Sequence, residues 1–416
     1  MALALGIDVG TSGVRAALLA PSGEVRGLAG ARLSDFGSAR NDPALWRAAL
    51  EATLAELGRE TALSRVRAVS IDATSGTVLG LDASGAPVGP ALMYDDAVAD
   101  PAIPAAIAAV APRESAAHGA SSGLARALAL QVRPGVKRIV HQADWMAAIL
   151  AGGLVASDES NALKTGYDPV AQRWPDWIAS TGLDPALLPA VVAAGVRTGR
   201  VGAGAFGVPA GAALIAGVTD GCASFLATGA DRPGDGVTAL GSTLTLKLLS
   251  DRPVFAPEAG IYSHRVGDLW LAGGASNSGG AVLAKYFTPE EIAALSERID
   301  PMRDSGLDYY PLRAPGERFP IRDPDLAPRL AQRPEDDADF LHGLLEGMAR
   351  IEAAGYRRLA ELGAPQLRRL RSVGGGAANP VWTEMRMRIV GAEPAEAVST
   401  EAAVGVARLA LPHLEP

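Results

Sequence analysis

The sequence predicts an α/β protein of two domains, and three observations support this prediction. The chain has 416 residues, more than one hydrophobic core normally accommodates. Apolar runs of strand length alternate along it with longer segments of helical periodicity. A pattern of strand, small polar turn and strand occurs at the N-terminus and again after residue 235. We therefore expect one domain over residues 1–229 and another over residues 230–400, with a last helix in residues 401–416 that packs back on the first domain.

The first domain is expected to begin with a hairpin and a helix. Residues 3–9 and 14–20 are apolar runs separated by a short turn, which predicts two antiparallel strands. Asp42 is a suitable N-cap and Pro43 a suitable first helical residue. Apolar residues then repeat at helical spacing, and Gly58 is expected to end this helix.

The rest of the first domain is expected to alternate strands and helices. Residues 66–72 predict a strand, residues 73–77 a loop of small polar residues, and the VLGLDASG run a hairpin-like continuation. Residues 101–150 are rich in alanine and are expected to be mainly helical. Residues 213–219 predict an apolar strand that leads into Asp220.

The second domain is expected to repeat this design. Residues 236–249 predict a second strand, turn and strand, and residues 336–362 a long amphipathic helix. A strand over residues 367–373 leads into three glycines, and Asn379 is a suitable N-cap for the next helix. A final helix is expected from about Glu401 to Leu411.

Composition argues against several classes of protein. The net charge of -8 and the lack of an extended basic face argue against a nucleic-acid partner. The N-terminal run lacks a basic region and meets Asp8 early, and no uncharged apolar stretch reaches membrane-spanning length. With the single cysteine Cys222, this predicts a cytoplasmic protein without a membrane partner. The five histidines show no metal-ligand spacing.

The first motif with chemical meaning follows the first strand. Asp8 ends a buried run, and the turn behind it contains Thr11, Ser12 and Gly13. Backbone N–H and hydroxyl groups in such a turn bind phosphate oxygens, while the acid holds Mg²⁺, usually through water. An ordinary hairpin in which Asp8 caps the turn is an equally good interpretation of the motif alone.

Two further motifs extend this interpretation. Gly241, Ser242 and Thr243 form the turn of the second hairpin. A tight turn explains these three residues best when they are taken alone, but their likeness to the first turn favours a second phosphate-binding turn. Asp220 stands between an apolar strand and Gly221, where an acid can serve as a general base. The spacing alone does not separate that role from a turn aspartate.

The glycine run and the loop after the 66–72 strand complete the set. Gly375 and Gly376 lie in a run of three glycines before a helix capped by Asn379, an arrangement that favours close approach of a phosphate or flat ring. Trp382 lies one turn further and is a candidate to flank an adenine; a flexible connection is the alternative. Ser75, in the ATSGT loop, is a candidate polyol contact, although a plain polar turn is equally consistent.

In chain order, these motifs resemble those of the FGGY carbohydrate kinase family. The first phosphate motif matches at Asp8–Gly13, the catalytic Gly-x-x-Asp motif at Gly217–Asp220, the second phosphate motif at Gly241–Thr243 and the adenosine motif at Gly374–Asn379. The resemblance spans nearly the whole chain. It implies the two-domain actin-like ATPase (ribonuclease H-like) fold, with the active site in the interdomain cleft.

Within that family, the chain is most similar to the short D-ribulose kinase-like (xylulose kinase-like) branch. The runs IDATSGTVLGLD, HQADWMA, NALKTGYDP, GIYSH, LAGGASNSGGAVL and SGLDYYPL carry this likeness. Two features depart from longer relatives. Residues 93–98 lack the usual Trp-x-Asp-x-Arg element, and Arg126 stands where a lysine is usual. Because of both departures, the sugar specificity of those relatives is a weaker guide to the substrate of this chain.

The resemblance implies phosphoryl transfer from MgATP to the terminal hydroxyl of a small ketose, D-ribulose first. It assigns proton acceptance to Asp220, Mg²⁺ binding to Asp8, and sugar contacts to Asp8, Ser75 and Asp220. Phosphate contacts fall to Thr11, Ser12, Gly13, Gly241, Ser242 and Thr243, and adenosine contacts to Gly375, Gly376, Asn379 and Trp382. The alternatives are a xylulose or other polyol kinase, a sugar-independent ATPase or nucleotide switch, and a sugar sensor without turnover. A monomer or small homo-oligomer is expected.

Overall fold

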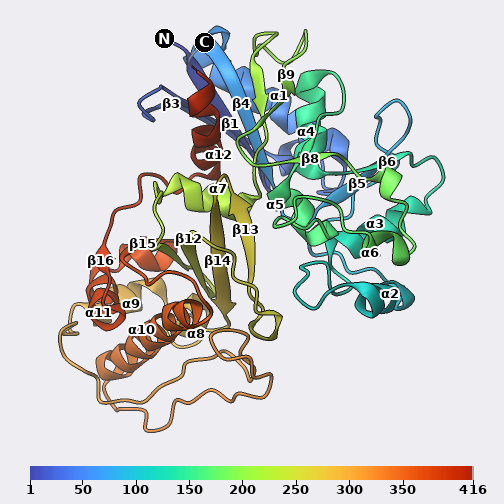
Figure 1. Cartoon of the computed structure of the whole chain (residues 1–416). Coiled ribbons are helices and arrows are strands. Elements are labelled where there is room, and N and C mark those ends of the chain that lie inside the picture. Colours follow the sequence, from blue (N-terminus) through green and yellow to red (C-terminus); the bar gives the residue numbers. More distant parts are fainter. Residues whose placement is uncertain (415–416) are drawn as a thin grey trace. The chain divides into compact units, whose positions relative to one another are not determined.

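The computed structural model describes residues 1–414 and divides into two compact units (Figure 1). The first unit contains Met1–Ala227, His264–Gly267 and the residues from Glu401 onward. The second contains Thr228–Ser263 and Asp268–Thr400. The last α-helix, α12 (Ala402–Ala410), belongs to the first unit. The expectation for residues 415 and 416 lies outside the described residues.

The first unit is built on a six-stranded mixed sheet with the order β3-β2-β1-β4-β10-β9. Strand β1 pairs antiparallel with β2 and parallel with β4, so the predicted N-terminal hairpin is confirmed. The strand bounds are β1 Leu3–Val9, β2 Gly13–Leu19, β3 Val25–Arg32, β4 Val66–Ala73, β9 Arg197–Arg200 and β10 Ala213–Ile215.

Both faces of β1 are covered, which explains why the whole strand is apolar up to Asp8. Leu5 and Ile7 belong to the larger core of this unit, to which α1 (Pro43–Glu60) and α4 (Gln142–Ala151) contribute. Helix α12 packs against β1 through small residues. A Cβ on Gly6 would lie 2.0 Å from the carbonyl oxygen of Ala403, so only glycine permits this approach.

Three local predictions need correction in the first unit. Helix α1 continues through Gly58 to Glu60, because the helical hydrogen bonding ends at Thr61, whose N–H and hydroxyl both donate to Leu57 O. Strand β5 (Val78–Leu81) pairs with the distant β6 (Arg138–His141), which interrupts the helical 101–150 segment. The strand predicted over residues 213–219 is regular only in β10.

The remaining elements of the first unit are short, and α2, α3 and α6 contribute to an apolar cluster separate from the core of the sheet. They are α2 Ala102–Val110, α3 Gly123–Gln131, α5 Glu159–Ala162, α6 Trp177–Ser180, α7 Asp220–Ala227, β7 Ser157–Asp158, β8 Val191–Val192 and the 3-10 turns η1 Leu33–Asp35, η2 Leu63–Arg65, η3 Leu163–Thr165, η4 Pro185–Leu187 and η7 Leu411–His413. Of these, α7 packs most closely against α12.

The second unit repeats the central strand pairing of the first, but not its full strand order. Its sheet has the order β13-β14-β12-β11-β15-β16. Strand β11 pairs antiparallel with β12 and parallel with β15, as β1 does with β2 and β4. The strand bounds are β11 Asp235–Leu240, β12 Leu244–Ser250, β13 Tyr262–Val266, β14 Leu269–Ser276, β15 Arg369–Val373 and β16 Glu393–Pro394. The predicted duplication of hairpins is therefore present in the sheet topology.

The helices of the second unit follow the sequence pattern closely. The predicted long helix is α10 (Asp337–Glu361), capped by Asp336 and packed on β12 and β14. The helix after the glycines is α11 (Pro380–Val390), capped by Asn379 as predicted. Shorter elements are α8 Gly280–Leu283, α9 Pro289–Ser296, η5 Pro257–Ala259 and η6 Gly375–Ala378. Among the described residues, no helix has both the length and the hydropathy needed to cross a membrane.

Candidate active site

Three aspartates from separate parts of the sequence are coupled at one edge of the first sheet. Asp8 near the end of β1 and Asp72 near the end of β4 are direct partners in the parallel register. Thr219 forms a single parallel bridge to Ala73, which places Asp220 just beyond these strand ends. Because parallel strands bring their carboxyl ends to one edge, local sequence alone could not show that these acids meet.

The electrostatics of this cluster follow from burial and mutual repulsion. Asp72 is fully buried, and burial, together with the charge of Asp8, raises its carboxyl pKa well above the ordinary value. Burial likewise raises the pKa of Asp8, with a smaller contribution from the charge of Asp220. The interaction of Asp8 with the neighbouring Asp72 carboxyl opposes this shift at Asp8. Of the two acids, Asp72 therefore has the stronger tendency to stay protonated.

Asp220 is the first residue of α7. Its Oδ1 accepts a hydrogen bond of 2.7 Å from the N–H of Gly221. The preceding residue is fixed by Ser160, whose Oγ accepts from the N–H of Thr219 at 3.1 Å. The carboxylate is partly exposed, so it is available to accept a proton from a bound hydroxyl.

The donor set suits a hydrated magnesium ion. Within residues 1–414, no three acidic, histidine or cysteine side chains form a complete metal-ligand group. Mg²⁺ keeps several waters and is commonly held by one or two carboxylates together with substrate phosphates. The Asp8 carboxylate fits that mode of binding. It lies beside the buried Asp72 in the parallel register of β1 and β4.

The loop that contains Ser75 is held by an ordered chain of hydrogen bonds. The Tyr94 N–H donates to Thr77 Oγ1 at 3.0 Å, and Thr77 Oγ1 lies 2.7 Å from Thr74 Oγ1. Thr74 in turn donates to Gln142 Oε1 at 2.6 Å. Ser75 Oγ is buried and has no partner among the described residues. Of the three hydroxyls in this loop, only that of Ser75 is left to bind a ligand.

The first predicted phosphate turn lies beside a hollow of about 510 Å³ in the first unit. Gly10 N–H donates to Gly13 O at 2.9 Å and closes the turn. Ser12 is exposed and Thr11 partly exposed, so their hydroxyls are accessible. A Cβ on Gly13 would lie 2.4 Å from Ala31 O, which explains glycine at this position.

The second predicted phosphate turn is supported by the segment around Gly280, which the sequence analysis noted for its family likeness but gave no role in the site. The carbonyl oxygens of Gly241 and Ser242 accept from the N–H groups of Gly280 and Ala281 at 2.8 and 3.1 Å. Ser242 is exposed, and Thr243 is partly exposed. The GGASNSGG run carries the supporting segment, so its unusual glycine content was an available signal.

The glycine run and α11 border a hollow of about 530 Å³ in the second unit. Gly375, Gly376, Asn379 and Trp382, the candidate adenosine contacts, all line it. The lining also includes apolar residues from outside the motif, among them Leu283, Phe287, Ile292 and Leu345. An apolar hollow beside glycine backbone suits a purine nucleoside.

The individual side chains in this hollow differ in what they offer a ligand. Trp382 is only 2% exposed, and its indole N–H donates to Leu345 O at 3.1 Å. Its ring lies beneath Gly376, so it supports the loop more than it presents an open face. The side chain of Asn379 caps α11 and also donates to Ser296 Oγ at 2.8 Å.

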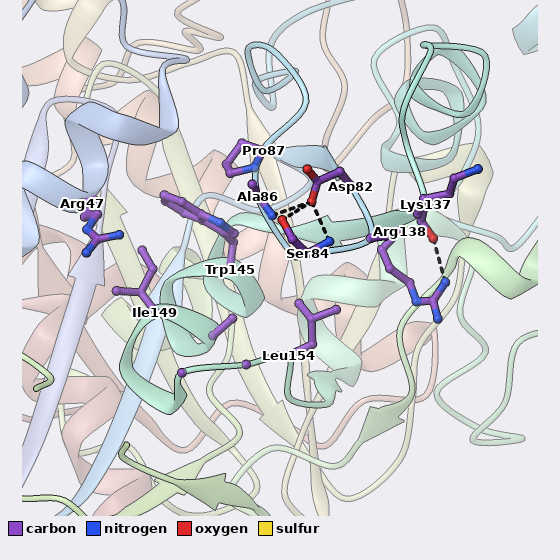
Figure 2. Close-up of a pocket in the computed structure, with 15 residues that line it drawn as sticks. Arg47, Asp82, Ser84, Ala86, Pro87, Lys137, Arg138, Trp145, Ile149 and Leu154 are labelled. Atoms are coloured by element: carbon purple, nitrogen blue, oxygen red, sulfur yellow. Dashed lines mark hydrogen bonds between the residues drawn. The ribbon is translucent and has the colours of Figure 1, made fainter. Parts of the chain in front are cut away.

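The sequence analysis missed Asp72 as a functional candidate. It follows an isoleucine at the end of a buried strand, as Asp8 does, and this repeated Ile-Asp pair was the available signal. A different hollow, of about 790 Å³, lies beside α4 and the 82–87 turn, with Trp145 on its wall (Figure 2). None of the predicted site residues lines it.

Comparison with known proteins gives a consistent picture. Residues 236–412 match the C-terminal domain of the FGGY family of carbohydrate kinases. The chain is 28% identical to a xylulose kinase of Streptomyces coelicolor over 94% of its length and 83% of that protein. It is 25% identical to a gluconokinase of Bacillus subtilis, over 43% of its length and 39% of that protein.

Solved structures resemble the whole chain. A xylulose kinase from Brucella ovis superimposes with a TM-score of 0.83 at 22% identity, covering 99% of this chain and 90% of that one. Plasmodium falciparum glycerol kinase with ADP gives a TM-score of 0.81 at 15% identity, covering 100% and 90%. These likenesses establish the two-domain actin-like ATPase fold.

Proposed function

We propose that this chain is a carbohydrate kinase of the FGGY family, and that it transfers the γ-phosphoryl group of ATP to the terminal hydroxyl of a small ketose, D-ribulose first. The observation that carries this proposal is the grouping of Asp8, Asp72 and Asp220 at the strand ends next to the Ser75 loop. Phosphoryl transfer requires mainly alignment and charge neutralisation, which such a grouping supplies.

In this proposal Asp220 accepts the proton of the attacking hydroxyl. Its carboxylate is accessible, while the neighbouring Asp72 is fully buried and unsuited to meet a substrate directly. Ser75 Oγ, the unpartnered hydroxyl of its loop, binds the sugar. Mg²⁺ bound by Asp8 would neutralise charge on the ATP phosphates.

The remaining predicted residues hold the nucleotide. In the first unit, Thr11, Ser12 and Gly13 would bind phosphate, and Gly241, Ser242 and Thr243 would do so in the second unit. The hollow beside Gly375 and Gly376 would hold the adenosine, with Trp382 as the support beneath that loop. We place the reaction in the cytoplasm, where MgATP is supplied.

D-xylulose is the second candidate acceptor, favoured by the 28% identity to a protein named xylulose kinase. The two pentuloses differ only in the configuration of one hydroxyl, so a single hydrogen bond can decide between them. A gluconate acceptor has the weaker support of a partial match to a gluconokinase.

The test is ADP release from MgATP with a panel of pentuloses, hexuloses, gluconate and glycerol, alongside a control without sugar. We expect a rate that depends strongly on sugar and is highest with D-ribulose. The highest rate with D-xylulose would replace the acceptor but keep the reaction. A slow rate that no sugar changes would overturn the kinase proposal in favour of a nucleotide switch.

A further inference from the structure

Arg126 on α3 is an unusual charged residue because its side chain is buried without a carboxylate partner. It is 1% exposed, and within residues 1–414 it forms no ion pair. Burial lowers the pKa of its guanidinium group to about 10, so it stays charged at neutral pH. A buried, uncompensated charge is costly unless its donors are fully used.

Four guanidinium hydrogen bonds are formed, and all four go to backbone carbonyl groups. Nη1 donates to Gly76 O, and Nη2 donates to both Tyr94 O and Ser121 O. Nε donates to Asp96 O at 3.0 Å. One side chain thus joins three loops that are separate in sequence. A planar fork of donors can do this, whereas a lysine ammonium cannot match all four directions.

One of these carbonyls belongs to the loop of Ser75. Thr77 N–H donates to Thr74 O at 3.2 Å, and Gly76 adopts a φ of +89° in the turn between them. With the Gly76 carbonyl held by Arg126, the Gly76–Thr77 peptide, one residue beyond Ser75, has a fixed orientation. The threonine hydroxyl chain fixes the same loop from its other side.

We infer that Arg126 is a positioning residue for sugar binding, which holds the Ser75 loop in the conformation that presents the Ser75 hydroxyl to the acceptor sugar. This inference rests on the proposed sugar kinase activity. It also gives a function to the departure from the usual lysine at this position. A preorganised loop binds with less loss of conformational entropy, so its loosening should appear in the affinity for sugar.

The first experiment measures kinetic constants for Arg126→Met and Arg126→Lys. We expect Arg126→Met to raise the KM for sugar by about 10–100-fold, with a smaller effect from Arg126→Lys, which keeps the charge and some donors. The KM for MgATP should change by less than about twofold, and kcat by less than about threefold, because uniform substrate binding is what is lost.

Arg133 supplies a matched control in the same unit. Its Nη1 also donates to backbone carbonyls, those of Val88 and Pro90, at 2.9 and 2.8 Å, but it makes no contact with the Ser75 loop. Arg133→Met removes a comparable backbone clamp. We expect it to leave the KM for sugar unchanged, with any effect confined to thermal stability.

A double-mutant cycle with Ser75→Ala separates positioning from general structural damage. If Arg126 acts through Ser75, Arg126→Met should raise the sugar KM far less in the Ser75→Ala background than in the wild type. If the sugar KM of the double variant equals the product of the two single fold-rises, the inference is overturned. An equal rise in the KM for MgATP would overturn it as well. If Arg126→Met does not fold, the same cycle is decided with Arg126→Lys.

The outcome is distinct from failure of the proposed function. A wild-type protein without sugar-dependent turnover would overturn the kinase proposal and this inference with it. A wild-type protein that phosphorylates D-ribulose or D-xylulose, with Arg126→Met retaining the wild-type KM for that sugar, would overturn the inference alone.

Discussion

Replacing Gly376 with alanine should weaken nucleotide binding through a specific steric conflict. The new Cβ would lie 2.5 Å from Trp382 Cζ3 and 2.8 Å from Leu240 Cβ. Carbon atoms in contact normally stay about 3.5–4.0 Å apart, so the loop or the indole must move by about 1 Å. Both groups line the 530 Å³ hollow, and this movement therefore changes its shape.

The size of the effect follows from the known cost of overfilling a packed site. Such substitutions cost about 1–3 kcal/mol. If the steric conflict destabilises only the ADP-bound protein, the Kd for ADP rises by about 5–150-fold. If the conflict destabilises the free protein as well, part of this free energy appears as a lower Tm instead.

Calorimetric titration with ADP and thermal unfolding measure these two parts. Gly375→Ala is the steric control, because its Cβ would meet no atom within 4 Å and the backbone there needs no positive φ. We expect Gly375→Ala to keep the wild-type Tm, so that any loss of ADP affinity in it reports contact with the ligand alone. Unchanged ADP affinity and unchanged Tm in Gly376→Ala would refute the reasoning.

Three further outcomes are expected. Asp220→Asn should lower kcat by about 10²–10⁴-fold with ADP affinity nearly unchanged, and a near-normal kcat would remove Asp220 as the base. Folding raises the pKa of Asp72, so the contribution of its carboxyl group to stability is present below its unfolded pKa and is lost as pH rises through its folded pKa. Asp72→Asn should therefore raise Tm more at pH 8 than at pH 5. An equal change in Tm at both pH values would contradict this. A Cβ on Gly405 would lie 1.8 Å from Ala223 O, so Gly405→Ala should destabilise the first unit by about 3 kcal/mol in denaturant titration, whereas Gly153→Ala, with no atom within 4 Å, should be neutral.

The motifs with a local physical signature were predictable from the sequence. Asp42 and Asn379 cap helices as predicted, because an N-cap depends on a side chain and the backbone two or three residues away. The two hairpins form where the apolar runs and small turns predicted them. The 530 Å³ hollow contains the two glycines because a strand, a glycine run and a capped helix lie together in the chain.

Contacts between distant segments were decided by the tertiary structure. Asp72 gains its partner Asp8 only through the parallel register of β1 and β4, and β5 pairs with β6 across 56 intervening residues. Sequence analysis noted Arg126 only as a departure from relatives, whereas the fold makes it a clamp on four carbonyls.

Trp382 shows the same division between local and distant information. Its place on α11 was evident from the sequence, but its burial beneath Gly376 depends on Leu345 of α10, whose carbonyl oxygen fixes the indole. The sequence by itself determined the two hairpins, the long helix and the helix caps, because those choices depend on near neighbours. The tertiary structure decided which side chains meet, because burial and pairing depend on segments that only the folded chain brings together.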